Sequence, residues 1–361
     1  MSGLNKNFRR KVVAVASDHA GNNKKMAILD YFEEAGIPYE DLGCYSNKSC
    51  DYPDFAHKIA EAIEEKEFEC GISFCGSGQG INITASYTRK LGEVNIELRG
   101  NFTLTRDKIL DYDEPPVQFS YLARQGSSND VTRGLIALGL FKDEDDVRNS
   151  PTHFGDVLPG DIKYQDVNGD GIINDYDIVP IGNARIPKSQ YGFAGSMMWK
   201  GIDFNIFFRG QAKADFFFGG TGFYPFSGGE RGNVLTIVND PKNRWIPTDY
   251  AVEHGIDLSL AENPNAKFPR LTYGDNINNN RPSTFWLTDA SFLRLKTLEI
   301  GYSLPQKMVK RIALNNFRIS VIGDNLYLWD KVKLWDPEQA SSNGAVYPLT
   351  RSWSLVLQLS L

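Results

Sequence analysis

The sequence has no long hydrophobic run and no excess of positive charge. None of its apolar stretches approaches the ~18 residues that a membrane-spanning helix needs. Its 39 Lys and Arg residues against 45 Asp and Glu residues give a net charge of -6, which argues against nucleic acid as a partner. The N-terminal residues 1–10 are polar and basic, and the apolar run at 12–16 is too short for the core of a signal peptide. The lack of an export signal predicts a cytoplasmic location.

Two residue types are each missing from one part of the chain. No cysteine follows residue 75, and no tryptophan precedes residue 199. The four cysteines lack the paired spacing of a zinc site, so reduced thiols are the default. A division of this kind is rare in a chain of uniform origin, and it predicts two parts, residues 1–85 and residues 86–361.

Residues 1–85 alternate short apolar runs with helical patterns. The strand-like runs are 11–17, 37–42 and 70–74, and a helical pattern follows each of the first two. This order predicts an α/β part with a Rossmann-like parallel sheet of three strands, whose ligands bind at the carboxyl ends of the strands. Asp18, His19 and Cys75 fall at such ends.

The stretch 75–80, Cys-Gly-Ser-Gly-Gln-Gly, has the composition of an active-site loop that leads into a helix. Glycine turns before a helix expose backbone N–H groups that hold an oxyanion or a phosphate. The Cys75 thiolate can act as a base, Asp18 can handle hydroxyl protons, and His19 can bind an anion. The alternatives are a small buried side chain for Cys75 and a helix cap or surface residue for His19.

Four segments of this part carry a resemblance to a known family. They are Ser-Asp-His-Ala-Gly at 17–21, Asp-Leu-Gly at 41–43, Asp-Tyr-Pro-Asp-Phe-Ala at 51–56 and the loop at 75–80. In order and spacing they resemble the ribose-5-phosphate isomerase B family, which includes the galactose-6-phosphate isomerases. The resemblance implies aldose–ketose isomerisation of a phosphorylated pentose or hexose through an enediolate, by a homo-oligomer that needs no cofactor.

The resemblance also implies a role for each site residue. Cys75 would be the base that moves a proton between two sugar carbons, Ser77 would help to form the anion hole, and Asp18 would contact sugar hydroxyls. The substrate- and phosphate-binding residues would be His19, Tyr52, Gly76, Gly78 and Gly80.

The family pattern stops after Ala85. Family members continue with an Ala-Asn-Lys segment, a His-Asn pair and phosphate-binding arginines. Here Ser-Tyr-Thr-Arg-Lys follows instead, and no histidine occurs between His57 and His153. We therefore expect a truncated isomerase domain with an open sheet edge and impaired activity.

Residues 86–361 have the alternating pattern of amphipathic strands. Strand-like runs lie at 94–105, 191–199, 202–209, 291–302, 317–329 and 353–361, with long polar loops at 107–133 and 219–283. Long strands with aromatic ends and uneven loops predict an antiparallel, β-rich, partial transmembrane-type barrel. A soluble β-sandwich is the alternative.

Five segments of this second part carry another resemblance. They lie at 98–103, 160–171, 268–273, 283–296 and 334–338, the last reading Leu-Trp-Asp-Pro-Glu. They resemble the C-terminal part of SusC/RagA-type transporters, which are TonB-dependent importers of glycans or peptides. The resemblance implies an outer-membrane location, with a SusD-like lipoprotein and TonB as partners of an intact transporter. Because such transporters close with about 22 strands, we expect a fragment.

Residues 166–177 have the spacing of a calcium-binding loop. The ligands would be Asp166, Asn168, Asp170, Ile172 through its carbonyl, Asn174 and Asp177. Gly171 takes the position that a calcium loop reserves for a sharp turn. The alternative is a metal-free turn, since Asx and Gly residues close such turns on their own.

Together these patterns predict a fusion of a truncated sugar-phosphate isomerase with a fragment of an outer-membrane nutrient transporter. One alternative is a TonB-linked outer-membrane protein that takes up glycans or peptides. The other is a non-functional gene fusion or an assembly artefact, which sequencing reads across codons 83–91 would reveal.

Overall fold

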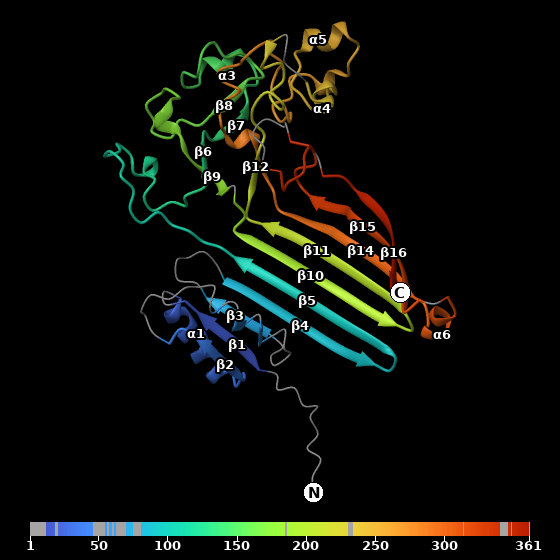
Figure 1. Ribbon diagram of the computed structural model, residues 1–361. Helices are drawn as coiled ribbons and strands as arrows, with labels where there is room; N and C mark the ends of the chain where they lie inside the picture. Colours follow the sequence, from blue (N-terminus) through green and yellow to red (C-terminus); the bar gives the residue numbers. More distant parts are fainter. Residues whose placement is uncertain are drawn as a thin grey trace.

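The computed structural model places a long sheet below a region of loops and short elements (Figure 1). It describes residues 12–18, 21–45, 55, 58–59, 61–62, 70–74, 81–184, 186–229, 234–312, 314–339, 346–347 and 349–360. No helix in these ranges is long and apolar enough to cross a membrane.

Ten strands form one sheet in the order β16-β15-β14-β11-β10-β5-β4-β3-β1-β2. Their bounds are β1 Val13–Ser17, β2 Tyr39–Gly43, β3 Cys70–Phe74, β4 Ile81–Leu91, β5 Val94–Leu104, β10 Ser189–Trp199, β11 Ile202–Ala212, β14 Phe292–Ser303, β15 Asn316–Asp330 and β16 Ser352–Ser360. Strands β2, β1 and β3 are parallel, and every pairing from β3 to β16 is antiparallel. The predicted chimeric architecture is confirmed.

Strand β4 corrects one expectation, because a helix was predicted after the glycine-rich loop. Residues 81–91 instead form one strand. Its first half pairs with β3, from Phe74↔Ile81 to Cys70↔Ala85, and its whole length pairs with β5 after a tight turn at Gly92. The residues from Ile81 alternate apolar and polar side chains with β-branched types, which favours a strand. The predicted seam after residue 85 therefore lies inside a strand, and the sheet is continuous across it.

One side of the sheet, from β4 to β16, carries apolar side chains that are exposed; we call it the apolar face. The antiparallel register aligns them across strands, as in the pairs Ile319↔Leu357 and Val321↔Leu355. Its exposed members include Tyr87, Leu98, Phe102, Phe193, Met197, Trp199, Ile300, Tyr302, Ile319, Val321, Trp353, Leu355, Leu357 and Leu359. Their exposure shows that the described residues provide no second layer over this face, as a β-sandwich would require.

The opposite side of the same strands is polar. Arg318 of β15 reaches across two strands, donating to Glu299 at 2.6 Å and to Asp203 at 3.0 Å. All three side chains are largely buried. Alternation of this kind gives the sheet one apolar and one hydrogen-bonded face.

The N-terminal unit, β1 to β3 with helix α1 (Asn22–Glu34), has a small core of its own. Val15, Leu29 and Phe32 are buried together, and Ile72 packs against them. Side chains of residues that are paired across strands lie on the same side of a sheet. Val15 of β1 is paired with Ile72 of β3, which is paired with residue 83 of β4, which is paired with Phe102 of β5. Helix α1 therefore lies on the side of the sheet that continues as the apolar face.

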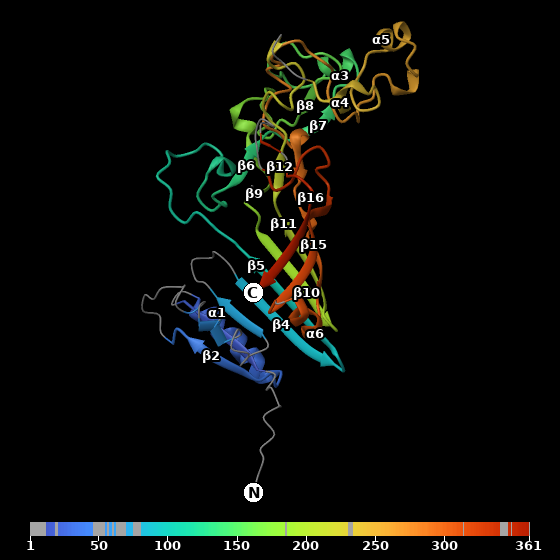
Figure 2. The same ribbon diagram turned by 45° about the vertical axis from the view of Figure 1, so that its right-hand side comes forward.

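Two long connections, 105–188 and 213–291, gather at one end of the sheet; we call them the loop region (Figure 2). Its strands are β6 Val131–Gly134, β7 Ala137–Leu140, β8 Ile162–Tyr164, β9 Val179–Ala184, β12 Asp215–Phe217 and β13 Leu287–Asp289. Its helices are α3 Glu144–Arg148, α4 Thr236–Asn239 and α5 Thr248–Glu253, with 3₁₀ turns at Ser120–Leu122, Asp175–Asp177, Leu258–Leu260 and Thr284–Trp286. The other end of the sheet has two-residue turns at 92–93 and 200–201 and a longer turn with α6 Gln306–Val309 and a 3₁₀ turn at Lys310–Ile312.

The loop region is packed around its own core. Leu135, Ile162, Tyr164 and Trp286 are each at most 2 % exposed and belong to one cluster. Hydrogen bonds tie the two connections together, since Trp286 Nε1 donates to the Asn279 carbonyl at 2.7 Å and Asn279 Oδ1 accepts from Ile162 N at 2.8 Å.

Replacing Arg318 by Met should destabilise the sheet, because it leaves the Asp203 and Glu299 carboxylates close together without their cation. We expect a loss of about 1–3 kcal/mol at neutral pH, measured by denaturant unfolding in detergent. The loss should shrink below about pH 4, where the two carboxylates take up protons. The matched control is Arg99→Met. The Arg99 side chain is exposed and pairs with Glu97, so its replacement should change stability little. Equal losses in both variants would contradict the assignment.

Candidate functional site

Asp18 is the one residue of the predicted isomerase site that lies among the described residues. It follows β1 directly, is 5 % exposed, and its Oδ1 accepts a hydrogen bond from the Gly21 N–H at 2.6 Å. Ser17 and Phe74, the last residues of β1 and β3, are register partners, so both strands end at the same edge of the sheet. The other predicted residues, His19, Tyr52, Cys75, Gly76, Ser77, Gly78 and Gly80, lie outside the described residues.

A buried lysine next to this edge was not foreseen from the sequence. Lys25 is fully buried, and its Nζ donates to Asp41 Oδ2 at 2.6 Å and to the carbonyls of Gly43 and Cys44 at 2.7 and 3.0 Å. The ammonium group thereby ties the first turn of α1 to the end of β2. Its position four residues before Leu29, on the buried side of the helix, was the signal that could have revealed it.

The predicted calcium ligands form a network of turns in the structure. Asp166 accepts from Gly169 N at 2.7 Å and from Gly171 N at 2.8 Å. Asp177, fully buried, accepts from Val167 N at 2.7 Å and from Asn174 N at 2.8 Å.

The four remaining ligands also make hydrogen bonds, and among them the Ile172 carbonyl accepts from Asn174 Nδ2 at 3.3 Å. Asp170 accepts from Ile172 N at 2.9 Å, and Asn168 accepts from Asp170 N at 3.1 Å. Asn174 accepts from Tyr176 N at 2.7 Å and caps the short 3₁₀ turn that follows. Among the described residues, no three His, Cys, Asp or Glu side chains converge as a metal ion would need. Calcium binding stays a prediction, and the hydrogen bonds favour the alternative of a metal-free turn.

Beside this loop, His153 is buried and acts as a structural residue. Its Nδ1 lies 2.7 Å from the Pro151 carbonyl, and its Nε2 accepts from Tyr164 N at 2.9 Å. Burial lowers the pKa of His153 below its usual value, consistent with a neutral ring that donates through Nδ1. The ring connects the loop region's core to the segment that precedes the 166–177 loop.

Two sets of relatives correspond to the two parts of the chain. Residues 13–91 match the family model described as Ribose/Galactose Isomerase. Ribose-5-phosphate isomerase B of Escherichia coli K12 is 37% identical over 76 residues, which cover 21% of this chain and 51% of that protein. TonB-dependent receptor P26 of Formosa agariphila is 30% identical over 213 residues, which cover 59% of this chain and 19% of that receptor.

A solved structure extends the second similarity to the fold. The RagAB peptide importer in its open-open state superposes with a TM-score of 0.55 at 18% identity, over 78% of this chain and 28% of that chain. The chain thus spans about half the length of the E. coli isomerase and about a fifth of the Formosa receptor. It joins an isomerase-like segment to a segment similar to TonB-dependent receptors.

A calcium titration followed by intrinsic fluorescence distinguishes the two interpretations of residues 166–177. Because the carboxylates already accept backbone N–H groups, we expect no saturable change up to the low-millimolar range in which weak calcium sites fill. A saturable response that is lost in Asp170→Asn and kept in Asp156→Asn, outside the loop, would instead establish a bound ion.

Proposed function

We propose that residues 86–361 are a segment of a TonB-dependent type importer of glycans or peptides that enters the outer membrane through the apolar face. The two-sided sheet is the observation that carries this proposal. Strands β4, β5, β10 and β11 have 11 residues each, the length with which a tilted strand crosses a bilayer.

The ends of the apolar face support the same orientation. Trp199 and Tyr302 lie near the two-residue turns, while Tyr327, Trp329 and Trp353 lie near the long connections, and all five are exposed. Aromatic side chains at both rims, with short turns at one end and long loops at the other, are typical of outer-membrane strands. In an intact transporter the loop region would face outward toward a SusD-like lipoprotein, and TonB would act from the opposite side.

The N-terminal unit limits how far a bilayer can extend across the sheet. Helix α1 lies on the side that continues as the apolar face, yet its outer side chains Lys24, Asp30 and Glu33 are exposed and charged. Charged groups on a helix surface are costly in hydrocarbon, so a bilayer over β4 cannot extend over α1. We infer that membrane entry requires the lipid to stop at β3 or the N-terminal unit to separate from β4.

Leu357→Lys tests the membrane proposal directly. Leu357 lies on the exposed apolar face of β16, so a charge there should cost about 2–4 kcal/mol near the bilayer centre and reduce partitioning into lipid vesicles at least about tenfold. Ser354→Lys, on the polar face of the same strand, is the matched control and should partition nearly as the unmodified chain does. Equal partitioning of both variants in flotation assays would refute the proposal.

We also propose that the N-terminal unit keeps part of a sugar-phosphate isomerase site, with Cys75 as base, Ser77 in the anion hole and Asp18 at the sugar hydroxyls. The support is the buried Asp18 carboxylate at the carboxyl edge of the parallel strands, where such folds bind ligands. The phosphorylated pentose or hexose would be bound by His19, Tyr52 and the glycines of the 75–80 loop.

Conversion of ribose 5-phosphate to ribulose 5-phosphate by the full chain would be slow and would depend on Cys75. We expect Cys75→Ala to lower the rate at least about 100-fold, the smallest effect typical of losing a catalytic base. Cys44→Ala is the matched control, because the buried Cys44 contributes its carbonyl rather than its thiol to Lys25. Absence of any conversion by the unmodified chain, or equal rates in both variants, would count against the proposed isomerase site.

A further inference from the structure

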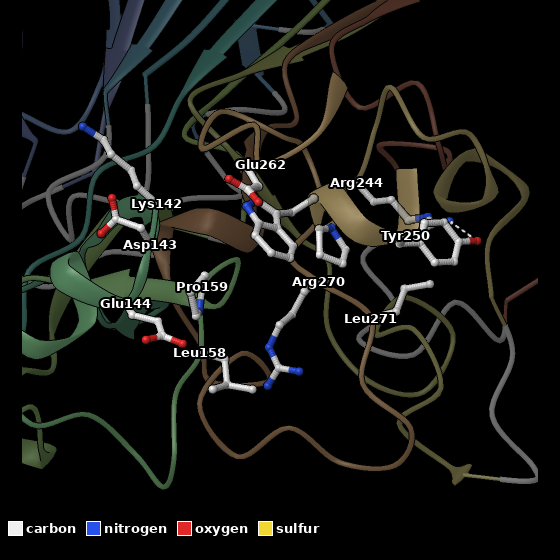
Figure 3. Close-up of a pocket in the computed structure, with 12 residues that line it drawn as sticks. Lys142, Asp143, Glu144, Leu158, Pro159, Arg244, Tyr250, Glu262, Arg270 and Leu271 are labelled. Carbon is white, nitrogen blue, oxygen red and sulfur yellow. Dashed lines mark hydrogen bonds between the residues drawn. The ribbon is translucent and has the colours of Figure 1, made fainter. Parts of the chain in front are cut away.

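A pocket of about 670 Å³ opens between the two connections of the loop region (Figure 3). Its volume is in the range of small-molecule sites. Trp245, Pro247 and Leu271 provide apolar lining, and Arg244 and Tyr250 lie side by side at one end.

The chain builds the back wall of this pocket from three segments. The backbone at Arg244 forms a bridge with Phe268, and Trp245 N donates to the Phe268 carbonyl at 2.9 Å. Gly160, at φ +86°, lies against the Trp245 ring so closely that a Cβ there would be 2.3 Å from the ring. The indole is thereby held in place by backbone that no other residue type could provide without rearrangement.

Arg244 is a buried cation without an ion-pair partner among the described residues. Three cationic side chains in these ranges are buried, and the other two are paired: Lys25 with Asp41 at 2.6 Å and Arg294 with Asp336 at 2.7 Å. Arg244 has the Tyr250 ring, with its centroid at 5.3 Å, and a long hydrogen bond of 3.4 Å to the Tyr250 hydroxyl.

Two buried donors in the same pocket wall lack acceptors. Neither Arg244 Nε nor Trp245 Nε1 has a hydrogen-bond partner in the described part of the chain. A buried donor without an acceptor and a buried charge without a counter-charge both destabilise the protein. A ligand that brings a carboxylate to Arg244 supplies the missing counter-charge and an acceptor for the guanidinium.

The other charged residues that line the pocket define what kind of anion fits; they are Lys142, Asp143, Glu144, Glu262 and Arg270. Arg270 forms an ion pair with the buried Asp161: its Nε lies 2.8 Å from Oδ1 and its Nη2 donates to Oδ2 at 3.0 Å, so its charge is already compensated. Asp143 and Glu144 lie on the wall opposite Arg244 (Figure 3). Their carboxylates repel a second negative charge, which disfavours phosphates and polyanions.

We propose that this pocket binds a small ligand through a single carboxylate held by Arg244, with the body of the ligand on Pro247 and Leu271. Arg244 Nε is covered in the structure, so binding is coupled to a rotation of Arg244 away from the Tyr250 ring. The carboxylate belongs to the C-terminus of a short peptide or to a uronate sugar. The choice of these two ligands rests on the proposed import of glycans or peptides. The pocket itself depends neither on membrane entry nor on isomerase chemistry, because all of its residues lie in the loop region.

Calorimetric titration of the full chain in detergent micelles tests the pocket with two matched pairs of probes. One pair is the tripeptide Gly-Leu-Ala and its C-terminal amide; the other is a galacturonate disaccharide and the corresponding neutral galactose disaccharide. We expect one acid to bind and its neutral analogue to bind at least about tenfold more weakly, the effect of losing a charged hydrogen bond. The acid that binds identifies the source of the carboxylate. Binding of neither acid, or equal binding within both pairs, would overturn the proposal.

Variants then assign the binding to Arg244. Arg244→Met should abolish acid binding without lowering thermal stability, because it removes an unpaired buried charge. Arg351→Met, at an exposed position outside the pocket, is the control and should bind normally. Should Arg244→Met fail to fold, Arg244→Lys keeps the charge and removes the planar pair of donors, and it should weaken binding several-fold. Unchanged affinity in a folded Arg244→Met or in Arg244→Lys would refute the assignment.

Discussion

The backbone pairing of β3 with β4 is the interaction on which the arrangement of the chain depends. It joins a parallel three-stranded sheet to a run of antiparallel strands, so the two parts of the chain share one ladder. Without it, β3 and β4 would each present unpaired N–H and C=O groups along an open edge. The pairing satisfies those groups whatever the origin of the two sequences, since backbone hydrogen bonding is independent of side-chain identity.

That shared ladder also creates a conflict between side chains. On one side of the sheet, helix α1 covers β1 with a small core around Val15 and presents charges outward. On the same side, strands from β4 onward present exposed residues such as Leu98 and Leu357. The charged surface of α1 is stable in water, whereas the apolar face of β4 to β16 is stable in hydrocarbon. Neither environment is favourable for both surfaces. The two parts are compatible in their backbones and incompatible in their surroundings.

The strands of the second part could be predicted from the sequence because their signal is local. The six predicted runs agree with β5, β10, β11, β14, β15 and β16 to within three residues at each end. Strand β4 was missed because the glycine-rich loop favoured a helix after it, although Ile81, Ile83 and Ala85 already alternate with polar residues. The alternation is a stronger signal than the glycine-rich loop. An alternating sequence gathers its apolar side chains on one face when it forms a strand and spreads them around the axis when it forms a helix.

The side-chain interactions of the candidate sites were less accessible to sequence reasoning. The position of Lys25 on the buried side of α1 could have indicated its burial but was not used, and Asp41 as its partner depends on how β2 packs. The spacing of residues 166–177 predicted metal ligands, whereas the structure directs the same oxygens to backbone N–H groups. For Arg244, the decisive feature is that its buried side chain has no carboxylate partner among the described residues. This can be seen only in the folded structure, where distant segments lie together.

The loop region is the part least affected by the conflict in the sheet. Its core residues, such as Tyr164 and Trp286, lie within the two connections, and Asn279 links those connections by hydrogen bonds at both Ile162 and Trp286. Proteins open locally in cooperative units, and a unit with its own buried core retains its structure when neighbouring strands separate. The pocket at Arg244 lies inside this unit, with its wall fixed by Gly160 against Trp245. Ligand binding there can therefore persist in a chain whose sheet neither closes nor enters a membrane.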